Sequence, residues 1–268
     1  MNNWLDQMYR KLSSLTLTGY AVLVMSFLYL PVLILIIFSF NDDRSLTLPL
    51  TGFTLRWYTA LFSNQDLLDA IYNSFYVAII ATGVTLLIGV PAAIALDRIE
   101  FPGKTAFRRL ILLPIALPGV ITGVSMLNLF KLMGMNLSLE TVILGHATGL
   151  VSIVVTQVYA RLQRMSRSIE EVSADLGARP IQTFFLVTLP NIKTAIIGSA
   201  LLSFTVSFDE IPVTFFLTGR DNTLPMYIWS TLRRGITPEI NAVGTLIVLT
   251  SLVLIVISVR MLRDEDRV

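Results

Sequence analysis

Two adjacent carboxylates, Asp209 and Glu210, lie in the stretch SFTVSFDEIPVTFFL, which contains no other charged residue. A charged side chain at mid-bilayer costs at least about 2.5–3.5 kcal/mol, so such residues usually face a cavity or a charged partner. We interpret the pair as bordering a translocation path, where one carboxylate meets a cationic solute. Adjacent helical residues point about 100° apart, which allows only one of them to face the path.

Two structural alternatives compete with this interpretation. In the first, the carboxylates form an ion pair with an arginine of this chain or of a partner subunit. In the second, the span ends before Asp209 and leaves the pair near the outer surface. Pro212 follows closely and is expected to loosen the helical backbone at this point.

The composition indicates a polytopic membrane protein. The chain has 268 residues, of which 54% are hydrophobic and 14% charged, and its mean hydropathy is +0.73. A soluble domain has about 25% charged residues. Cysteine is absent and His146 is the single histidine, so thiolate and multi-histidine metal sites are excluded. We find no nucleophile–histidine–acid set, and one histidine in a predicted span offers little acid–base chemistry. We expect no metal site and, with a net charge of only +2, no nucleic-acid partner.

Six apolar runs are long enough to cross a bilayer, which takes about 20 helical residues. They cover about residues 15–40, 70–96, 110–130, 141–160, 192–217 and 240–259. The first is too long for a secretory signal and is read as an uncleaved span. Pro114 and Pro118 are expected to break the third. The predicted fold is an all-α integral membrane protein with six transmembrane helices in a single domain over residues 1–268.

The placement of lysine and arginine predicts the topology. Most of the 20 basic residues, from Arg10 and Lys11 onward, fall in segments on the same side as both termini. Because cytoplasmic loops carry the excess of positive charge, both termini are predicted to be cytoplasmic. The same rule places the charged segment Ser166–Pro190 inside the cell.

The segment Ser166–Pro190 (SRSIEEVSADLGARPIQTFFLVTLP) reads as a helix, a break and a second helix. Ser168 and Glu171 fit a capping box at the start of the first helix. Gly177 can adopt the left-handed conformation that ends a helix, and Pro180 suits the first turn of the next. Pro190 is expected to close the unit and to open the following membrane helix.

The spacing of Glu171, Gly177 and Leu189-Pro190 fits the pattern E-A-A, three residues, G, nine residues, I-x-L-P. Val172 and Ser173 stand at the alanine positions and Val187 at the isoleucine. The pattern resembles the cytoplasmic coupling loop of the permease subunits of bacterial ABC importers. The alternative is an ordinary amphipathic loop helix between two spans.

Most of the chain is similar to the MetI-like permeases, and in particular to the second permease subunit of spermidine/putrescine-type importers. The other matching stretches are Gly52–Tyr58, Asn73–Ala78, Ser207–Gly219 and Ile236–Ala242. The resemblance implies that the loop docks on an ATPase, so that nucleotide-driven closure moves the membrane helices. It places the ATPase-coupling residues at Glu170, Glu171, Ala174, Asp175, Gly177, Ala178 and Pro190.

The resemblance also implies partners in a bacterial inner membrane. These are a cytoplasmic ATP-binding subunit dimer, a second permease subunit, an extracytoplasmic solute-binding protein and the membrane lipid. No cofactor is expected in this chain, because ATP and Mg would be bound by the partner ATPase. Gly103-Lys104-Thr105 imitates the end of a phosphate-binding loop, but Arg98 stands at the first glycine position, and we reject the match.

The expected function is import of a small cationic or amine solute, with polyamines such as spermidine and putrescine foremost. Polyamine permeases often carry an acidic residue after the proline of the third span, where this chain has Gly119. Another small amine or an amino-acid-like solute is therefore the alternative. An ion-coupled secondary transporter is more remote, and so is a membrane enzyme, because adjacent carboxylates on a helix do not converge on one atom.

Overall fold

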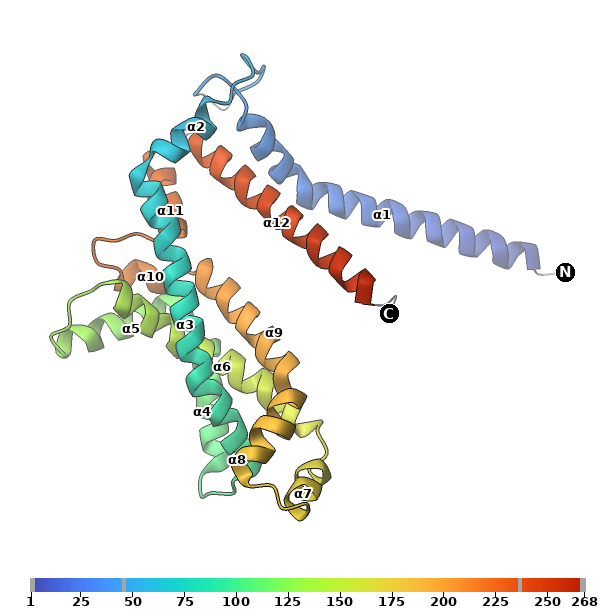
Figure 1. Cartoon of the computed structure of the whole chain (residues 1–268). Helices are drawn as coiled ribbons and strands as arrows, with labels where there is room; N and C mark the ends of the chain where they lie inside the picture. Colours follow the sequence, from blue (N-terminus) through green and yellow to red (C-terminus); the bar gives the residue numbers. More distant parts are fainter. Residues whose placement is uncertain (1–2, 45–46, 236–237, 266–268) are drawn as a thin grey trace. The chain divides into compact units, whose positions relative to one another are not determined.

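The computed structural model describes residues 3–44, 47–235 and 238–265, and their secondary structure is helical apart from loops and one isolated bridge between Asn41 and Phe53. Side chains are described over 16–44, 47–233, 235 and 238–253. The elements are α1 (Asn3–Phe38), α2 (Arg56–Ser63), α3 (Gln65–Arg98), α4 (Lys104–Ala116), α5 (Gly119–Leu132), α6 (Leu139–Gln163), α7 (Ser168–Asp175), α8 (Pro180–Thr183), the π-helix η1 (Phe184–Thr188), α9 (Leu189–Phe208), α10 (Pro212–Leu217), α11 (Leu224–Arg234) and α12 (Pro238–Glu265) (Figure 1). The predicted all-α class is confirmed.

Four described helices are long and apolar enough to cross a membrane: Thr16–Phe38, Gln65–Arg98, Leu139–Gln163 and Pro180–Phe208. The bent pair α4 and α5 makes a fifth span if it is counted as one. In α12 the described apolar part, Pro238–Val253, is shorter than a full span. The count of six stays a prediction, and the side chains of Arg10 and Lys11 and the residues Ile236 and Thr237 lie outside what the structure describes.

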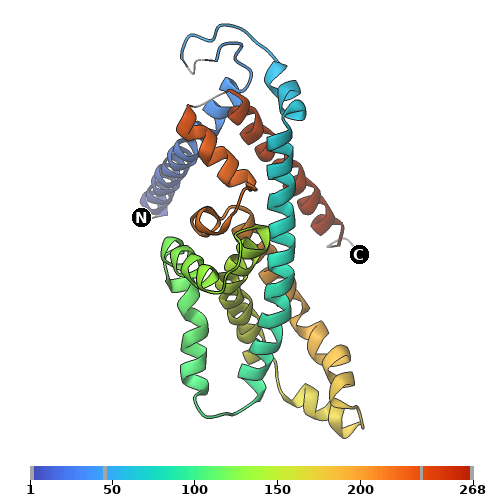
Figure 2. The same ribbon diagram turned by 90° about the vertical axis from the view of Figure 1, so that its left-hand side faces the viewer.

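The third predicted span is broken, as expected, but at one proline rather than two. α4 and α5 are bent by 105° across Leu117 and Pro118, a turn that is clear in Figure 2. Leu117 is extended because the residue before a proline is pushed out of the helical region. Pro114 lies inside α4 without ending it. The Ser152 hydroxyl of α6 hydrogen-bonds the Ile111 carbonyl in the preceding turn, a form of support that membrane helices with proline commonly use.

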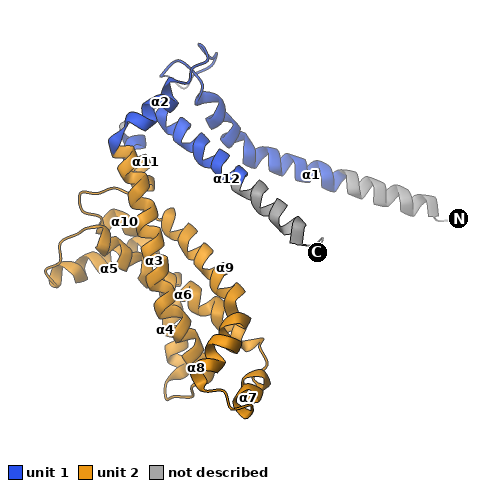
Figure 3. Ribbon diagram, viewed as in Figure 1, with its two compact units in different colours: residues 1–65, 230–268 blue, residues 66–229 orange. Residues whose placement is uncertain are grey.

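The described chain divides into two compact units (Figure 3). Unit 1 comprises Met1–Gln65 and Ser230–Val268, and unit 2 comprises Asp66–Trp229. In unit 1, α1 and α12 pack closely, since a Cβ on Gly244 would lie 3.0 Å from Leu35 Cδ1. The buried indole of Trp57 donates to the Asn41 carbonyl at 2.7 Å and anchors α2 to the end of α1.

Helix α6 is the centre of unit 2. One buried cluster joins it to α3 and α9 through Leu96, Val155, Val158 and Ile192, among others. A second cluster joins it to α3, α5 and α10 through residues that include Val142, Ile143, Val213 and Leu217. The segments α7 and α8 lie at the end of unit 2 that is remote from α5 and α10 (Figures 1 and 2).

The contact between α6 and α10 depends on Gly145. A Cβ there would lie 2.9 Å from Val213 Cγ1 and closer still to Leu217 Cδ1, and Leu217 is fully buried. Gly149 is one turn further along α6, and a Cβ built on it would have no other heavy atom within 4 Å. The first glycine is therefore required for the close approach of the two helices, and the second is not.

Gly145→Ala should therefore lower stability, because overpacking a dense core costs about 1–3 kcal/mol. Gly149→Ala is the matched control and should be neutral or slightly stabilising, since alanine is favoured over glycine in helices. Thermal unfolding of the two purified variants in detergent tests this. Equal melting temperatures for the two variants would contradict the tight packing of α10 on α6.

Candidate functional site

Gly177 ends α7 in the way that the sequence predicts. Its φ is +87°, in the left-handed region. Its amide donates to the Ala174 carbonyl at 2.8 Å, and the Ala178 amide donates to the Ser173 carbonyl at 3.1 Å. These two bonds are the Schellman motif, which satisfies the free carbonyls of a helix end and sets the direction of the chain that leaves it.

The predicted capping box at Ser168 and Glu171 does not form. The residue preceding α7 is Arg167, which has helical dihedral angles, and no side-chain cap is present. The Ser168 hydroxyl is instead 2.6 Å from the Ser166 hydroxyl. The Glu171 amide already bonds the Arg167 carbonyl, so the helix begins one residue earlier than a Ser168 cap requires.

The second half of the segment is continuous with the membrane helix. Pro180 occupies the first turn of α8, as predicted. Pro190 lies in the first turn of α9, as predicted for the start of the membrane helix, but no break precedes it, because α8, η1 and α9 form one run from Pro180 to Phe208. The run widens into a π-helical turn just before Pro190, where the proline has no amide to donate. The Asn191 side chain bonds the Val187 carbonyl at 2.8 Å and supports this turn.

The predicted coupling residues fall in three places. Glu170, Glu171, Ala174 and Asp175 are on α7, Gly177 and Ala178 are in the turn after it, and Pro190 is in α9. Around them lies an exposed apolar surface, which we call the coupling surface and define as Ile169, Val172, Leu176, Ile181 and Phe185.

The coupling surface is far from covered. Val172 is 55% and Leu176 is 84% exposed, and α7 contains no buried residue at all. Glu171 and Asp175 are exposed beside these apolar groups. An exposed apolar patch with a polar rim is typical of a protein interaction site.

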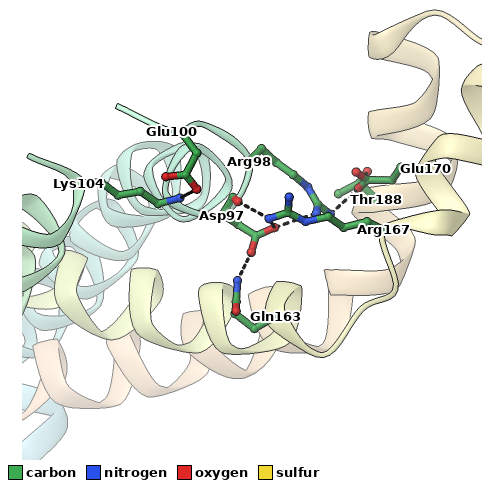
Figure 4. A network of polar contacts seen from close by, with 8 residues as sticks. All are labelled: Asp97, Arg98, Glu100, Lys104, Gln163, Arg167, Glu170 and Thr188. Carbon is green, nitrogen blue, oxygen red and sulfur yellow. Dashed lines mark hydrogen bonds and ion pairs between the residues drawn. The ribbon is translucent and has the colours of Figure 1, made fainter. Parts of the chain in front are cut away.

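Glu170 differs from its neighbour Glu171, because it faces the interior of unit 2 (Figure 4). Its Oε1 accepts from Arg98 Nη2 at 2.8 Å and from the Thr188 hydroxyl at 2.6 Å. Arg98 Nη1 lies 2.8 Å from Asp97 Oδ2, so this guanidinium bridges two carboxylates. The planar fork of arginine suits such a bridge.

Asp97 is the most deeply buried charge of the network, with 2% of its side chain exposed. Its Oδ1 accepts from Gln163 Nε2 at the end of α6. Arg167 Nη2 donates to the Asp97 carbonyl at 2.7 Å and lies 4.0 Å from Oδ2. The network therefore ties the ends of α3 and α6 to α7 and to η1. Sequence reasoning did not identify Asp97, Gln163 or Thr188; the available signal was an Asp-Arg pair that closes a long apolar run.

Asp209 and Glu210 lie at a break between two helices, whereas the sequence predicts that they lie inside a continuous span. α9 ends at Phe208, with Asp209 as its C-cap, and α10 begins at Pro212. Glu210 Oε1 accepts from the Val213 amide at 3.0 Å and so caps α10. Among the described residues of unit 2, no lysine or arginine forms an ion pair with either carboxylate.

A cavity of about 180 Å³ lies beside this break. Its lining comes from the break between α4 and α5, from α6, and from the break between α9 and α10. Most of the lining is apolar, and Glu210 is its one carboxylate, whereas Asp209 is exposed and does not line it. The lack of a side chain at Gly119 allows Glu210 and Pro212 to lie close to the start of α5. A Cβ on Gly119 would be 3.3 Å from Glu210 Oε1 and 3.1 Å from Pro212 Cβ.

His146 holds the two sides of the break together. Its Nδ1 is 2.8 Å from the Ser207 hydroxyl of α9, and its Nε2 is 2.9 Å from the Thr214 hydroxyl of α10. The Thr214 hydroxyl donates its proton to the Glu210 carbonyl at 2.8 Å. The same hydroxyl oxygen therefore accepts a hydrogen bond from His146 Nε2. The histidine thus joins α9 to α10 through one hydrogen bond to each helix.

Gly103-Lys104-Thr105 forms the start of α4, where Lys104 pairs with Glu100 at 2.7 Å. Among the described residues, no three histidine or acidic side chains gather into a group that could hold a metal ion.

The segment Ser166–Pro190 and the two carboxylates of Asp209 and Glu210 lie at opposite ends of α9. The 20 residues of α9 correspond to about 30 Å at 1.5 Å per residue. The arrangement can transmit displacement of α7 and α8 to a cavity that contains one carboxylate.

Comparisons with known proteins agree with this arrangement. A family model described as "binding-protein-dependent transport system inner membrane component" matches residues 86–263. The putrescine transport system permease protein PotI of Escherichia coli (strain K12) is 38% identical over 230 residues, which are 83% of this chain and 82% of that protein. The spermidine/putrescine transport system permease protein PotC of Haemophilus influenzae is 34% identical over 249 residues, which are 92% of this chain and 96% of that protein.

Solved structures show the same fold at low identity. A bacterial ABC transporter involved in the import of the acidic polysaccharide alginate has a TM-score of 0.70 at 16% identity, and the match covers 96% of each chain. The inward-facing MetNI methionine ABC transporter has a TM-score of 0.57 at 18% identity, and the match covers 74% of this chain and 93% of that chain. Because the family model matches residues 86–263 and the two relatives match 83% and 92% of the chain, this protein belongs to the multi-pass inner-membrane components of binding-protein-dependent transport systems, the MetI-like ABC permeases.

Proposed function

We propose that this chain is the permease subunit of an ATP-driven importer for a small cationic amine, with putrescine and spermidine the first candidates. The observation that carries the proposal is the placement of an exposed coupling surface and a carboxylate-bearing cavity at the two ends of α9. The names of the relatives, which are putrescine and spermidine/putrescine permeases, support the solute class.

The proposal includes partners that supply what this chain lacks. Two copies of a cytoplasmic ATPase would bind ATP and Mg and hydrolyse the nucleotide. A second, different permease would complete the translocation path, and an extracytoplasmic binding protein would deliver the solute. Residues 1–268 would act as one permease domain, with both termini cytoplasmic, which the bias of lysine and arginine supports.

The proposed mechanism begins at the coupling surface. Closure of the ATPase dimer moves α7, whose angle to the next element is fixed by the Gly177 turn. Because α8, η1 and α9 are continuous, the displacement passes along α9 to the break at Asp209 and Glu210. The hinge-like break then changes the width of the path, and solute passes Glu210.

One observation favours an amine other than a polyamine as the second candidate. Glycine at 119 stands where polyamine permeases often carry an acidic residue, and the space beyond it is filled by Pro212 and Glu210. A single carboxylate suits a solute with one ammonium group better than a solute with several.

Replacing Gly177 with valine should reduce uptake at least about tenfold, because a β-branched residue is strained at positive φ by about 1–2 kcal/mol or more and would reset the turn after α7. Gly134 has φ +69°, and like Gly177 it has open space where a Cβ would lie, so Gly134→Val is a matched control for the strain alone. Uptake of radiolabelled putrescine and spermidine, normalised to membrane insertion, is the measurement. Equal uptake by the two variants would remove Gly177 from the coupling mechanism.

Glu210→Gln should weaken transport of a cationic solute about tenfold, since it removes the charge and keeps an oxygen that can accept from the Val213 amide. Asp209→Asn removes the neighbouring charge outside the cavity and should have a much smaller effect. Initial uptake rates over a range of solute concentrations compare the two. A larger defect in Asp209→Asn would reverse the assignment.

A further inference from the structure

We propose that Arg98 and Asp97, at the end of α3, are positioning residues that hold the coupling helix α7 in the orientation in which it meets the ATPase. This inference rests on the proposed function. It assigns a role to residues outside the coupling segment itself, on a helix that precedes it by about 70 residues in the chain.

Helix α7 has few contacts with the rest of unit 2 apart from this network. None of its residues is buried, and its apolar side chains Ile169 and Val172 are exposed. Burial of apolar surface, the usual source of tertiary stability, therefore contributes little here. Besides the ion network, one hydroxyl pair, Ser173 and Thr183 at 3.0 Å, joins α7 to α8.

The charges of the network are balanced. Two carboxylates, Asp97 and Glu170, alternate with two guanidinium groups, Arg98 and Arg167. The side chains of Arg98 and Glu170 are only 19% and 20% exposed, so solvent screens this pair less than a surface pair. Removing Arg98 would leave the two carboxylates without the cation that lies between them, which is far worse than losing a neutral contact.

The network connects α7 to two other elements, α3 and η1. Glu170 is bound at once to the end of α3 through Arg98 and to η1 through Thr188. Arg167, just before α7, donates to the Asp97 carbonyl in the last turn of α3, where a helix has free carbonyls and a negative dipole end. The coupling helix thus has a noncovalent attachment to α3 in addition to its covalent connection to α9.

The role predicts a separation between binding and coupling. Arg98→Gln leaves the coupling surface and the predicted coupling residues unaltered, so the ATPase should still bind. The orientation of α7 would then be loose, and ATP hydrolysis would no longer respond to solute. Arg98→Lys keeps the charge but cannot bridge both carboxylates with a planar fork, so it should rescue only part of the response.

A neighbouring ion pair provides the control. Lys104 and Glu100 form a pair at 2.7 Å close to the network, but the Glu100 side chain is 86% exposed (Figure 4). Glu100→Gln removes one charge near the same helix end without touching α7. Any general effect of charge loss at this surface should appear in this variant as well.

The first measurement is amide hydrogen exchange of the full-length chain in lipid nanodiscs, without ATPase. Exchange of the amides of α7 should be about tenfold faster or more in Glu170→Gln and Arg98→Gln, and unchanged in Glu100→Gln, because local opening governs exchange. Amides of α6, in the buried core, should be unaffected and report that the variants fold. Unchanged exchange of α7 in Glu170→Gln would overturn the proposal.

The second measurement is ATP hydrolysis by the assembled transporter in the presence of solute-loaded binding protein. The solute is putrescine or spermidine, whichever stimulates hydrolysis by the unaltered complex more. Stimulation should fall at least about fivefold in Arg98→Gln, while basal hydrolysis and co-purification of the ATPase persist. Faster exchange in α7 with full stimulation would also overturn the proposal. A different result would contradict the proposed function, namely full uptake by Gly177→Val. That result would not change the expected exchange rates of the α7 amides.

Discussion

The stiffness of a continuous α-helix is the constraint on which the rest of this structure depends. Each residue advances the axis by about 1.5 Å and is fixed by backbone hydrogen bonds, so a helix transmits displacement along its length with little loss. From Pro180 to Phe208 the chain contains no interruption, even though Pro190 lies within it. A π-helical turn accommodates that proline, and the rod survives. Without this continuity, movement at α7 would be absorbed before it reached the carboxylates.

Flexibility is placed where the rod ends. Both α4–α5 and α9–α10 break at a proline, and the two breaks meet at the cavity lined by Glu210. Irregular backbone at membrane depth is tolerated where it lines a cavity or is covered by protein. Small residues at 119 and 145 let the broken segments approach each other, and His146 joins α9 to α10 across the gap. In the proposed mechanism this site is the hinge, and these few contacts hold its two sides together.

Features that depend on local chemistry could be predicted from the sequence. The left-handed turn at Gly177, the helix start at Pro180 and the break at Pro118 each follow from the backbone preferences of one or two residues. The predicted capping box at Ser168 is absent because Arg167 extends the helix by one residue. Pro190 starts α9 as predicted, but it does not close the preceding unit, because a wider π-helical turn accommodates the proline ring. The network of Asp97, Arg98 and Glu170 could not be predicted, since Glu170 is about 70 residues from the other two and meets them only in the folded chain.

A thiol probe can measure directly whether movement of the segment Ser166–Pro190 changes the structure at the far end of α9. The chain has no cysteine, so Val206→Cys, in the cavity lining, introduces a unique thiol. We predict that its reaction rate with a water-soluble maleimide differs at least about tenfold between nucleotide-free and ATP-trapped transporter, as expected for a change between closed and open states. Adding Gly177→Val should abolish the difference. A rate that is the same in both nucleotide states of the otherwise unaltered transporter would contradict the account.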